Sequence, residues 1–119
     1  MCAGCIENEG LEAMDLDALR AKLTPQTKVV FFCSPHNPGG NVWSPAEIRA
    51  LAAFCAERNL ILVSDEIHCD LLLRDVKHTP TLSAVPEIAD RLITCFAATK
   101  TFNLAGAHAH WDRRSHPSH

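Results

Sequence analysis

Three polar residues whose side chains could do acid–base and covalent chemistry follow three apolar runs of the sequence. They are Asn37, Asp65 and Lys100, and His68 comes close behind the aspartate. A lysine amine can act as a nucleophile or a base, a carboxylate can hold a proton, and an amide can donate hydrogen bonds. Each type also has a commoner use, because lysines are mostly exposed and Asn and Asp are frequent in loops. Chemistry is expected only if the fold brings the set together.

The apolar runs predict strands that would do so. Residues 28–33 form a continuous run rich in β-branched and aromatic side chains, which is typical of a strand buried on both faces of a parallel sheet. Residues 60–64 and 91–96 predict a second and a third strand. In open α/β sheets, ligand-binding groups collect outside the carboxyl ends of the strands. The polar residues are therefore expected to meet at one edge of the sheet.

A helix is expected between the first two strands. Ser44 is a suitable cap, Pro45 suits the first helical position, and Glu47 can reach back to the N–H of the cap. Apolar residues then recur at three- and four-residue spacing to about Arg58, and Asn59 is a plausible left-handed terminator. Strand, helix and strand in this order predict a right-handed βαβ unit with parallel strands.

The remaining segments are assigned by their turn residues and periodicity. Residues 15–23 have the apolar spacing of a short surface helix. Residues 34–40 contain two prolines and two glycines and predict a loop. The link through Pro80 and Pro86 is expected to be irregular, and residues 108–119, which lack periodicity, to be an unstructured tail. The fold class is α/β.

Length, composition and charge exclude several classes of protein. A chain of 119 residues is one domain at most, and 47% hydrophobic with 21% charged residues is ordinary for a globular protein. The net charge is −3 and the basic residues are scattered, so no nucleic-acid partner is expected. The apolar runs are too short to cross a bilayer and no secretory signal precedes them, so a cytoplasmic protein without a membrane partner is expected.

The cysteines predict neither disulfides nor a metal site. Three of the six lie within apolar segments, where a free thiol behaves as a small hydrophobe (Cys33, Cys55 and Cys95). Cys2 and Cys5 have the spacing of metal ligands, but a structural zinc site needs four ligands and no second CxxC or HxxxH pair exists upstream of the tail. We therefore expect reduced cysteines and no metal.

Three short motifs follow the predicted strands: SPHNPGG at residues 34–40, SDEIH at residues 64–68 and ATKTFN at residues 98–103. In order and approximate spacing they resemble the motifs of the fold-type I pyridoxal phosphate enzymes, the aminotransferase class I and II superfamily. The resemblance extends over roughly residues 6–107. It implies part of a three-layer α/β/α large domain with mostly parallel strands, incomplete here, in which residues 6–107 form the part that binds the cofactor.

The resemblance assigns a role to each polar residue. Lys100 matches the lysine that forms an imine with pyridoxal 5'-phosphate and then serves as a base beside the substrate Cα. Asp65 matches the carboxylate that keeps the pyridine nitrogen protonated, so that the ring acts as an electron sink. Asn37 matches the amide that donates to the phenolic oxygen. Thr99 matches a hydroxyl that binds the phosphate.

His68 points to a branch of the family. Many aminotransferases carry a tyrosine at this position that also contacts the phenolic oxygen, so the resemblance implies that His68 contacts the cofactor there. The strings around Asn37, His68 and Lys100 look most like the cystathionine β-lyases, also called cysteine-S-conjugate β-lyases. That branch cleaves a carbon–sulfur bond of a sulfur-containing amino acid and releases a thiol, pyruvate and ammonia. An aminotransferase is the alternative within the family. The resemblance also implies that full-length relatives are homodimers.

Departures from the family pattern favour a second alternative, a non-catalytic fragment. Ala97 stands where the family has a phosphate-binding hydroxyl, and His108 stands where many aminotransferases have an arginine. Neither the family's glycine-rich phosphate loop nor its smaller domain has a counterpart in these residues, so the chain looks like a truncated piece of the large domain. A sheet cut from a larger one exposes edges and apolar faces, which promote association. His36 and His78 are interpreted as loop histidines.

Overall fold

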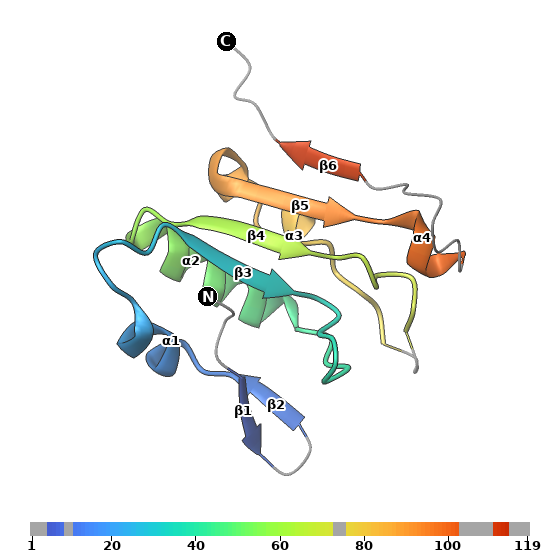
Figure 1. Ribbon diagram of the computed structural model, residues 1–119, viewed down its shortest axis with the longest axis horizontal. Coiled ribbons are helices and arrows are strands. Elements are labelled where there is room, and N and C mark those ends of the chain that lie inside the picture. The colour runs from blue at the N-terminus through green and yellow to red at the C-terminus, as the bar shows by residue number, and fades with distance from the viewer. Residues whose placement is uncertain (1–4, 9–10, 73–75, 103–110, 115–119) are drawn as a thin grey trace.

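The described residues of the computed structural model, 5–8, 11–72, 76–102 and 111–114, form an α/β structure built on a four-stranded sheet (Figure 1). The strand order is β3-β4-β5-β6. Their bounds are β3 Val29–Cys33, β4 Ile61–Asp65, β5 Leu92–Phe96 and β6 Trp111–Arg114. Strands β3, β4 and β5 are parallel, and β6 pairs antiparallel with β5. The three strands expected from the apolar runs are confirmed.

Helix α2 (Pro45–Glu57) connects β3 to β4 and begins where the sequence predicts it. The Oγ of Ser44 accepts a hydrogen bond from the backbone N–H of Glu47, and the Glu47 carboxylate accepts one from the N–H of Ser44, so both halves of the capping box are present. The helix ends before Asn59, whose φ of 52° lies in the left-handed region that suits a helix terminus. The βαβ unit is therefore confirmed.

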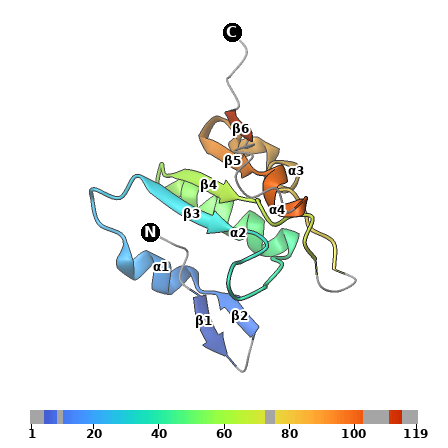
Figure 2. The same cartoon turned by 45° about the vertical axis from the view of Figure 1, so that its right-hand side comes forward.

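Three further helical segments, α1, α3 and η1, lie on the same face of the sheet as α2. Helix α1 (Leu16–Lys22) precedes β3, and Asp15 caps it by accepting from the N–H groups of Asp17 and Ala18. Helix α3 (Thr81–Ala84) and the kinked 3₁₀ helix η1 (Pro86–Arg91) pack between α2 and β5. Figures 1 and 2 place α2 behind the sheet from both directions. Of the three layers expected, the described residues supply two.

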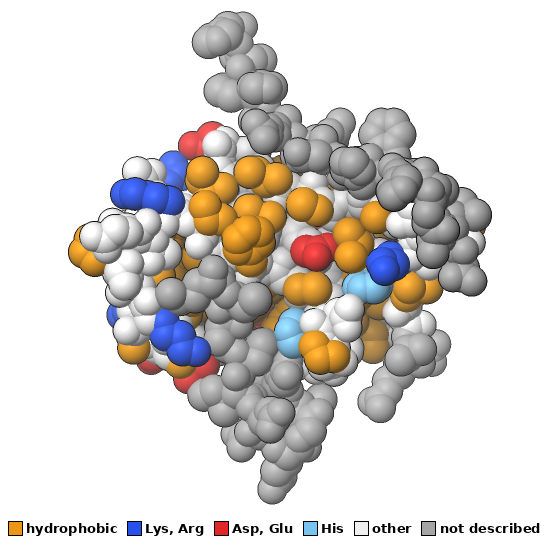
Figure 3. All heavy atoms as spheres, viewed as in Figure 1, with side chains coloured by type: hydrophobic (Ala, Val, Ile, Leu, Met, Phe, Trp, Pro, Cys, Tyr) orange, Lys and Arg blue, Asp and Glu red, His pale blue; other side chains and the backbone are white. Residues whose placement is uncertain are grey.

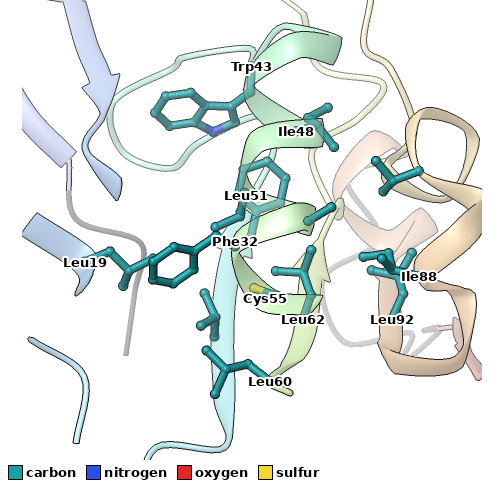
Figure 4. Close-up of a cluster of buried hydrophobic side chains, with 14 residues drawn as sticks. Leu19, Phe32, Trp43, Ile48, Leu51, Cys55, Leu60, Leu62, Ile88 and Leu92 are labelled. Carbon is teal, nitrogen blue, oxygen red and sulfur yellow. The ribbon is translucent and has the colours of Figure 1, made fainter. Parts of the chain in front are cut away.

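The core lies between the sheet and these helices. Alternate residues of the strands point into it, including Val30, Phe32 and Leu62, which are at most 2% exposed. They meet the apolar stripe of α2, and Leu19 of α1 closes the core at the β3 end (Figure 4). The other labelled side chains of the cluster are Trp43, Ile48, Leu51, Cys55, Leu60, Ile88 and Leu92.

The opposite side of the sheet, which we call the open face, has no helix on it among the described residues. It is formed by the alternate strand residues Val29, Phe31, Cys33, Ile61, Val63, Asp65, Ile93 and Cys95. Phe31 is 51% and Ile61 39% exposed. Figure 3 shows hydrophobic side chains gathered on this face, with acidic, basic and histidine side chains toward the end to which the strand arrows of Figure 1 point.

Two expectations about irregular segments are wrong. The link through Pro80 and Pro86 contains α3 and η1, because Pro80 is the N-cap of α3 and Pro86 opens η1, and neither position needs an N–H for a helical hydrogen bond. The tail expected to be unstructured over 108–119 contains β6, which covers the edge of β5; the backbone of an open strand edge can pair with a segment of almost any sequence. Residues 108–110 and 115–119 lie outside the described residues.

The sequence patterns also miss a hairpin. Strands β1 (Cys5–Asn8) and β2 (Leu11–Met14) pair antiparallel, with Cys5 opposite Met14. Each strand has only four residues, which is too short for an alternating pattern to be recognised. No helix in the described part of the chain is both long and apolar enough to cross a membrane.

Candidate active site

The carboxyl ends of three parallel strands form one edge of the sheet, and the candidate residues lie on the segments that leave it. Cys33, Asp65 and Cys95 lie side by side in register across β3, β4 and β5. All three belong to the open face, because their side chains alternate with the buried ones of each strand. The Asp65 carboxylate therefore has a cysteine on each neighbouring strand.

The loop after β3 positions Asn37. It contains two cis peptide bonds, Ser34–Pro35 and Asn37–Pro38. It is closed by two backbone hydrogen bonds, of 2.6 Å and 2.8 Å, that link His36 to Gly40 and Asn41. Gly40 has a φ of 75°, which glycine adopts without steric strain. The loop holds Asn37 at its exposed tip.

Trp43 fastens the end of this loop to the sheet. Its indole Nε1–H donates a 2.9 Å hydrogen bond to the backbone carbonyl of Cys33, the last residue of β3. Its ring lies 6.3 Å from the ring of Phe32 and 6.4 Å from that of His36. Trp43 is buried, so both ends of the loop share the same support.

The turn after β4 positions Asp65 and His68. The Oδ1 of Asp65 accepts a 3.2 Å hydrogen bond from the N–H of Ile67, which restrains the carboxylate at the end of the strand. The backbone carbonyl of Glu66 accepts from the N–H of Cys69, and that of His68 accepts from the N–H of Leu71. Two consecutive turns thus carry His68 away from the strand end.

The two loops meet through Asn37 and His68. The Nδ2 of Asn37 lies 3.3 Å from the Nε2 of His68. An amide nitrogen can only donate, so Nε2 is the acceptor and the ring hydrogen lies on Nδ1. Two residues that the sequence analysis selects from separate motifs are therefore in contact, and the structure brings the amide and the imidazole to one place.

Lys100 and Thr99 lie on the segment that leaves β5. Helix α4 (Ala98–Thr101) begins two residues after the strand ends and carries both side chains, Lys100 exposed and Thr99 half-buried. No hydrogen bond or ion pair joins Lys100 to Asn37, Asp65 or His68 among the described residues. The structure thus places the lysine at the same edge of the sheet, without a direct contact to the other candidates. Asn103 and His108 lie outside the described residues.

The donor set at this edge fits the ring of pyridoxal phosphate. A carboxylate suits a protonated pyridine nitrogen, an amide and an imidazole suit a phenolic oxygen, and an exposed amine suits an aldehyde. For the phosphate, the hydroxyl of Thr99 is available, whereas Ala97 offers no side-chain donor. The described residues therefore offer more suitable contacts to the cofactor ring than to its phosphate.

A buried polar cluster next to Asp65 escaped the sequence analysis. Glu66 is fully buried, and its Oε1 accepts hydrogen bonds of 3.0 Å from the Oγ of Ser64 and from the N–H of Thr81. Its Oε2 lies 2.7 Å from the Nε2 of His78. Burial opposes ionisation of this carboxyl, but the hydrogen bonds from His78, Thr81 and Ser64 outweigh it and hold the pKa of Glu66 below its ordinary 4.5.

The interpretation of His78 as a loop histidine is incomplete, because its side chain is only 8% exposed and belongs to this cluster. Glu66 and His78 are 12 positions apart in the sequence, and no periodicity of the sequence between them indicates a contact. The feature of the sequence that could have indicated this cluster is the position of Glu66 itself. A carboxylate next to a buried strand end needs a partner, and a histidine is one that the chain supplies.

Comparison with known proteins finds relatives over most of the chain. Residues 8–109 match the family described as aminotransferase class I and II. Cystathionine β-lyase PatB of Bacillus subtilis is 43% identical over 105 residues, which are 87% of this chain and 27% of that protein. A probable N-succinyldiaminopimelate aminotransferase, DapC of Mycobacterium tuberculosis, is 38% identical over 83% of this chain and 25% of its own length.

The fold has the same relatives. The crystal structure of cystalysin from Treponema denticola, which contains a pyridoxal 5'-phosphate cofactor, superposes with a TM-score of 0.89 at 34% identity. The superposition covers 97% of this chain and 29% of that one. The chain therefore spans between 25% and 29% of the length of these three relatives.

Proposed function

Because the chain belongs to the aminotransferase class I and II family, we propose that it is the cofactor-binding part of a pyridoxal phosphate-dependent carbon–sulfur β-lyase. The substrates would be cystathionine or cysteine-S-conjugates, and the products a thiol, pyruvate and ammonia. The observation that carries the proposal is the contact between Asn37 and His68 beside Asp65, because a histidine in this place distinguishes the lyase-like motif.

Each residue at the carboxyl edge would contact a different part of the cofactor. When bound, pyridoxal phosphate would supply an electron sink for negative charge developing at the substrate Cα. Asp65 would keep a proton on the ring nitrogen, and the Nδ2 of Asn37 would donate a hydrogen bond to the phenolic oxygen. The Nζ of Lys100 would hold the cofactor covalently and, once released, move the Cα proton. Thr99 would donate its hydroxyl to the phosphate.

His68 would act through Asn37. With its ring hydrogen on Nδ1, His68 accepts one amide hydrogen of Asn37 at Nε2 and so orients the other for the phenolic oxygen. A tyrosine in its place would offer a hydroxyl that can itself donate to that oxygen. This difference supports the lyase branch over the aminotransferase branch.

An aminotransferase is the second candidate. The similarity to DapC of Mycobacterium tuberculosis, at 38% identity, supports it. The two candidates share the chemistry at Asp65 and Lys100 and differ in the fate of the substrate's amino group. A lyase releases it as ammonia together with pyruvate, whereas an aminotransferase passes it to a keto acid.

The first test is covalent attachment of the cofactor to one lysine. Adding pyridoxal phosphate to the 119-residue chain should give a visible absorbance, and borohydride reduction followed by peptide mapping should locate the label on Lys100. Lys100→Ala should lose both signals, while Lys28→Ala, which removes an exposed lysine before β3, should keep them. Equal absorbance and labelling elsewhere in Lys100→Ala would contradict the assignment of Lys100.

The second test separates the two reactions. The loaded protein is given cystathionine and assayed for pyruvate and ammonia, and in parallel for a new amino acid in the presence of a keto acid. Pyruvate release without a keto acid supports the lyase. Amino transfer that depends on the keto acid supports the aminotransferase. Cofactor attachment with neither reaction indicates a binding part that requires the rest of a longer protein.

A further inference from the structure

Glu66 and His78 form a buried polar contact directly behind the candidate site. The carboxylate is fully buried and accepts hydrogen bonds from Ser64, Thr81 and His78. The Oγ atoms of Ser64 and Thr81 are 2.7 Å apart, which joins the strand end to the first residue of α3. Since a carboxylate can only accept, the Nε2 of His78 carries the hydrogen in this contact.

Glu66 and Asp65 share a backbone segment but face opposite ways. Asp65 belongs to the open face, and Glu66 points into the layer that contains α3. The backbone on either side is held by neighbouring strands: the carbonyl of Asp65 accepts from the N–H of Ser34, and the N–H of Glu66 donates to the carbonyl of Cys95, both at 2.9 Å. Because the two residues are adjacent, a change in how the Glu66 side chain is held would reach Asp65 through this shared backbone.

The same contact holds a later part of the chain against the turn that carries His68. The Glu66 carboxylate accepts hydrogen bonds from His78 and Thr81, 12 and 15 positions later, and so keeps both residues close to the end of β4. His68 lies two residues after Glu66, within the turns that follow β4. Loss of the contact would free this later part of the chain and relax the turn that supports His68.

We propose that Glu66 and His78 are a positioning pair that sets the orientation of Asp65 and His68 for the cofactor ring. The proposal rests on the proposed function and deepens it, because neither residue touches the cofactor atoms assigned above. Glu66 supplies a fixed anion, and His78 is the donor that can be removed without changing the strand. The lowered pKa of Glu66 agrees with an ionised carboxylate in this contact.

The test compares three variants of the full chain. His78→Leu removes the donor, and His78→Gln keeps an N–H donor near the position of Nε2. Val85→Ala is the matched control: it truncates a fully buried side chain between α3 and η1 that makes no side-chain hydrogen bond to the cluster. His78→Leu and Val85→Ala are both expected to lower the melting temperature, so stability alone does not distinguish a positioning role.

The first readout needs no cofactor. The imidazole signals of His68 and the side-chain amide signals of Asn37 are followed by NMR in the folded proteins. His78→Leu should shift both sets, while His78→Gln and Val85→Ala should leave them close to wild type. Unchanged His68 and Asn37 signals in folded His78→Leu would overturn the proposal, whether or not the chain binds pyridoxal phosphate.

The second readout is the affinity for pyridoxal phosphate, measured by absorbance in the wild-type and Asp65→Asn backgrounds. A misplaced orienting group commonly costs about 10-fold or more, so His78→Leu should weaken binding about 10-fold in the wild-type background and less than about 2-fold in Asp65→Asn. His78→Gln and Val85→Ala should stay within about 3-fold of wild type, a limit set well below that loss.

The outcomes separate this proposal from the proposed function. If Val85→Ala weakens binding as much as His78→Leu, or if His78→Leu acts equally in both backgrounds, the pair is structural only and the positioning role is overturned. If the wild-type chain shows no absorbance that depends on Lys100, the proposed function fails instead, and the NMR comparison still decides whether the pair orients Asn37 and His68.

Discussion

The Nδ2 of Asn37 lies 3.3 Å from the Nε2 of His68, joining two loops that are 31 residues apart in the chain. One loop leaves β3 and the other leaves β4, so this contact connects two neighbouring strands beyond the last pair of backbone hydrogen bonds. Its function would be to present an oriented amide to a ligand at the carboxyl edge.

This contact predicts non-additive effects on cofactor binding. Asn37→Ala and His68→Ala should each weaken the affinity for pyridoxal phosphate, and the double variant should lose less than the two single losses combined. The coupling free energy should be about 0.5–1 kcal/mol, the range of a single exposed hydrogen bond. Absorbance titrations of the four proteins measure it. Strictly additive losses would show that the two side chains act independently.

The lowered pKa of Glu66 predicts a loss of stability in acid. The folded pKa lies below the unfolded value of about 4.5, so the unfolded chain binds the proton more readily. The contribution of Glu66 is therefore fully present above pH 4.5 and is lost as the pH falls through the folded pKa. Urea unfolding between pH 7 and pH 3 measures the effect. The free energy of unfolding should fall less steeply with decreasing pH in Glu66→Gln than in wild type.

The control for this effect is Asp17→Asn, which changes a carboxylate that is 86% exposed on α1. In this variant the free energy of unfolding should depend on pH much as it does in wild type, because exposed charges are screened by solvent. If the free energy of unfolding depends on pH identically in wild type and Glu66→Gln, Glu66 does not contribute to the acid sensitivity of the fold.

The capping box of α2 predicts a measurable cost for one hydroxyl. Ser44→Ala should lower the free energy of unfolding by about 1 kcal/mol, because the N–H of Glu47 loses its acceptor. Ser83→Ala, at an exposed position of α3, is the matched control and should change it by less than about 0.5 kcal/mol. Urea unfolding at pH 7 compares them. Equal effects would mean that the helix start does not depend on this cap.

Cys55 is predicted to be the least reactive of the described cysteines. Burial raises the pKa of its thiol to about 11, although Arg58 and Arg91 act in the opposite direction. A pulse of iodoacetamide at pH 8 should label the half-buried Cys33 in the folded chain and leave Cys55 unlabelled, whereas in urea both should react. Mass spectrometry of the peptides reads the result. Equal labelling of both in the folded chain would mean that the core around α2 opens readily.

The raised pKa of Cys55 also has a consequence in alkali. The folded thiol keeps its proton to a higher pH than the unfolded one, whose pKa is about 9. The folded state is therefore increasingly disfavoured as the pH rises from 9 toward 11. Cys55→Ala should reduce this alkaline loss.

The open face predicts concentration-dependent association. Phe31 is 51% exposed and is paired with Val63 of β4, two residues along that strand from the 39% exposed Ile61, so a second copy or another apolar surface can bury both exposed side chains. Phe31→Ser should reduce association measured by sedimentation at increasing concentration. Ile93→Val, which keeps the half-buried third strand of this face apolar, is the control and should behave like wild type. Unchanged association in Phe31→Ser would exclude this face as the contact.

The sheet and α2 are predictable because each local pattern agrees with the packing that it meets in the fold. Residues such as Val30 and Leu62 occur in runs long enough to be recognised, and Ser44 and Asn59 mark the helix ends by their own backbone preferences. The order of the elements then places Asn37, Asp65 and Lys100 at one edge without any knowledge of their contacts.

The parts that escape prediction depend on pairing between distant residues. The backbone of β6 is held by β5, and the Glu66 carboxylate is held by His78 and Thr81, so neither leaves a periodic signal in its own segment. The same is true of Trp43, whose indole closes the Asn37 loop on Cys33. From the sequence alone, β6 is part of a polar tail, Glu66 is an acidic residue in a turn, and Trp43 is an isolated aromatic residue. Their partners become visible only in the folded structure.

The alternation of side chains at the end of β4 has a consequence for how this segment can change over generations. Asp65 and Glu66 are neighbours with similar side chains and opposite surroundings, one on the open face and one fully buried. Inserting or deleting a single residue within β4 would exchange their surroundings, placing Glu66 on the open face and Asp65 in the interior. Point substitutions along β4 are therefore far better tolerated than a change of its length.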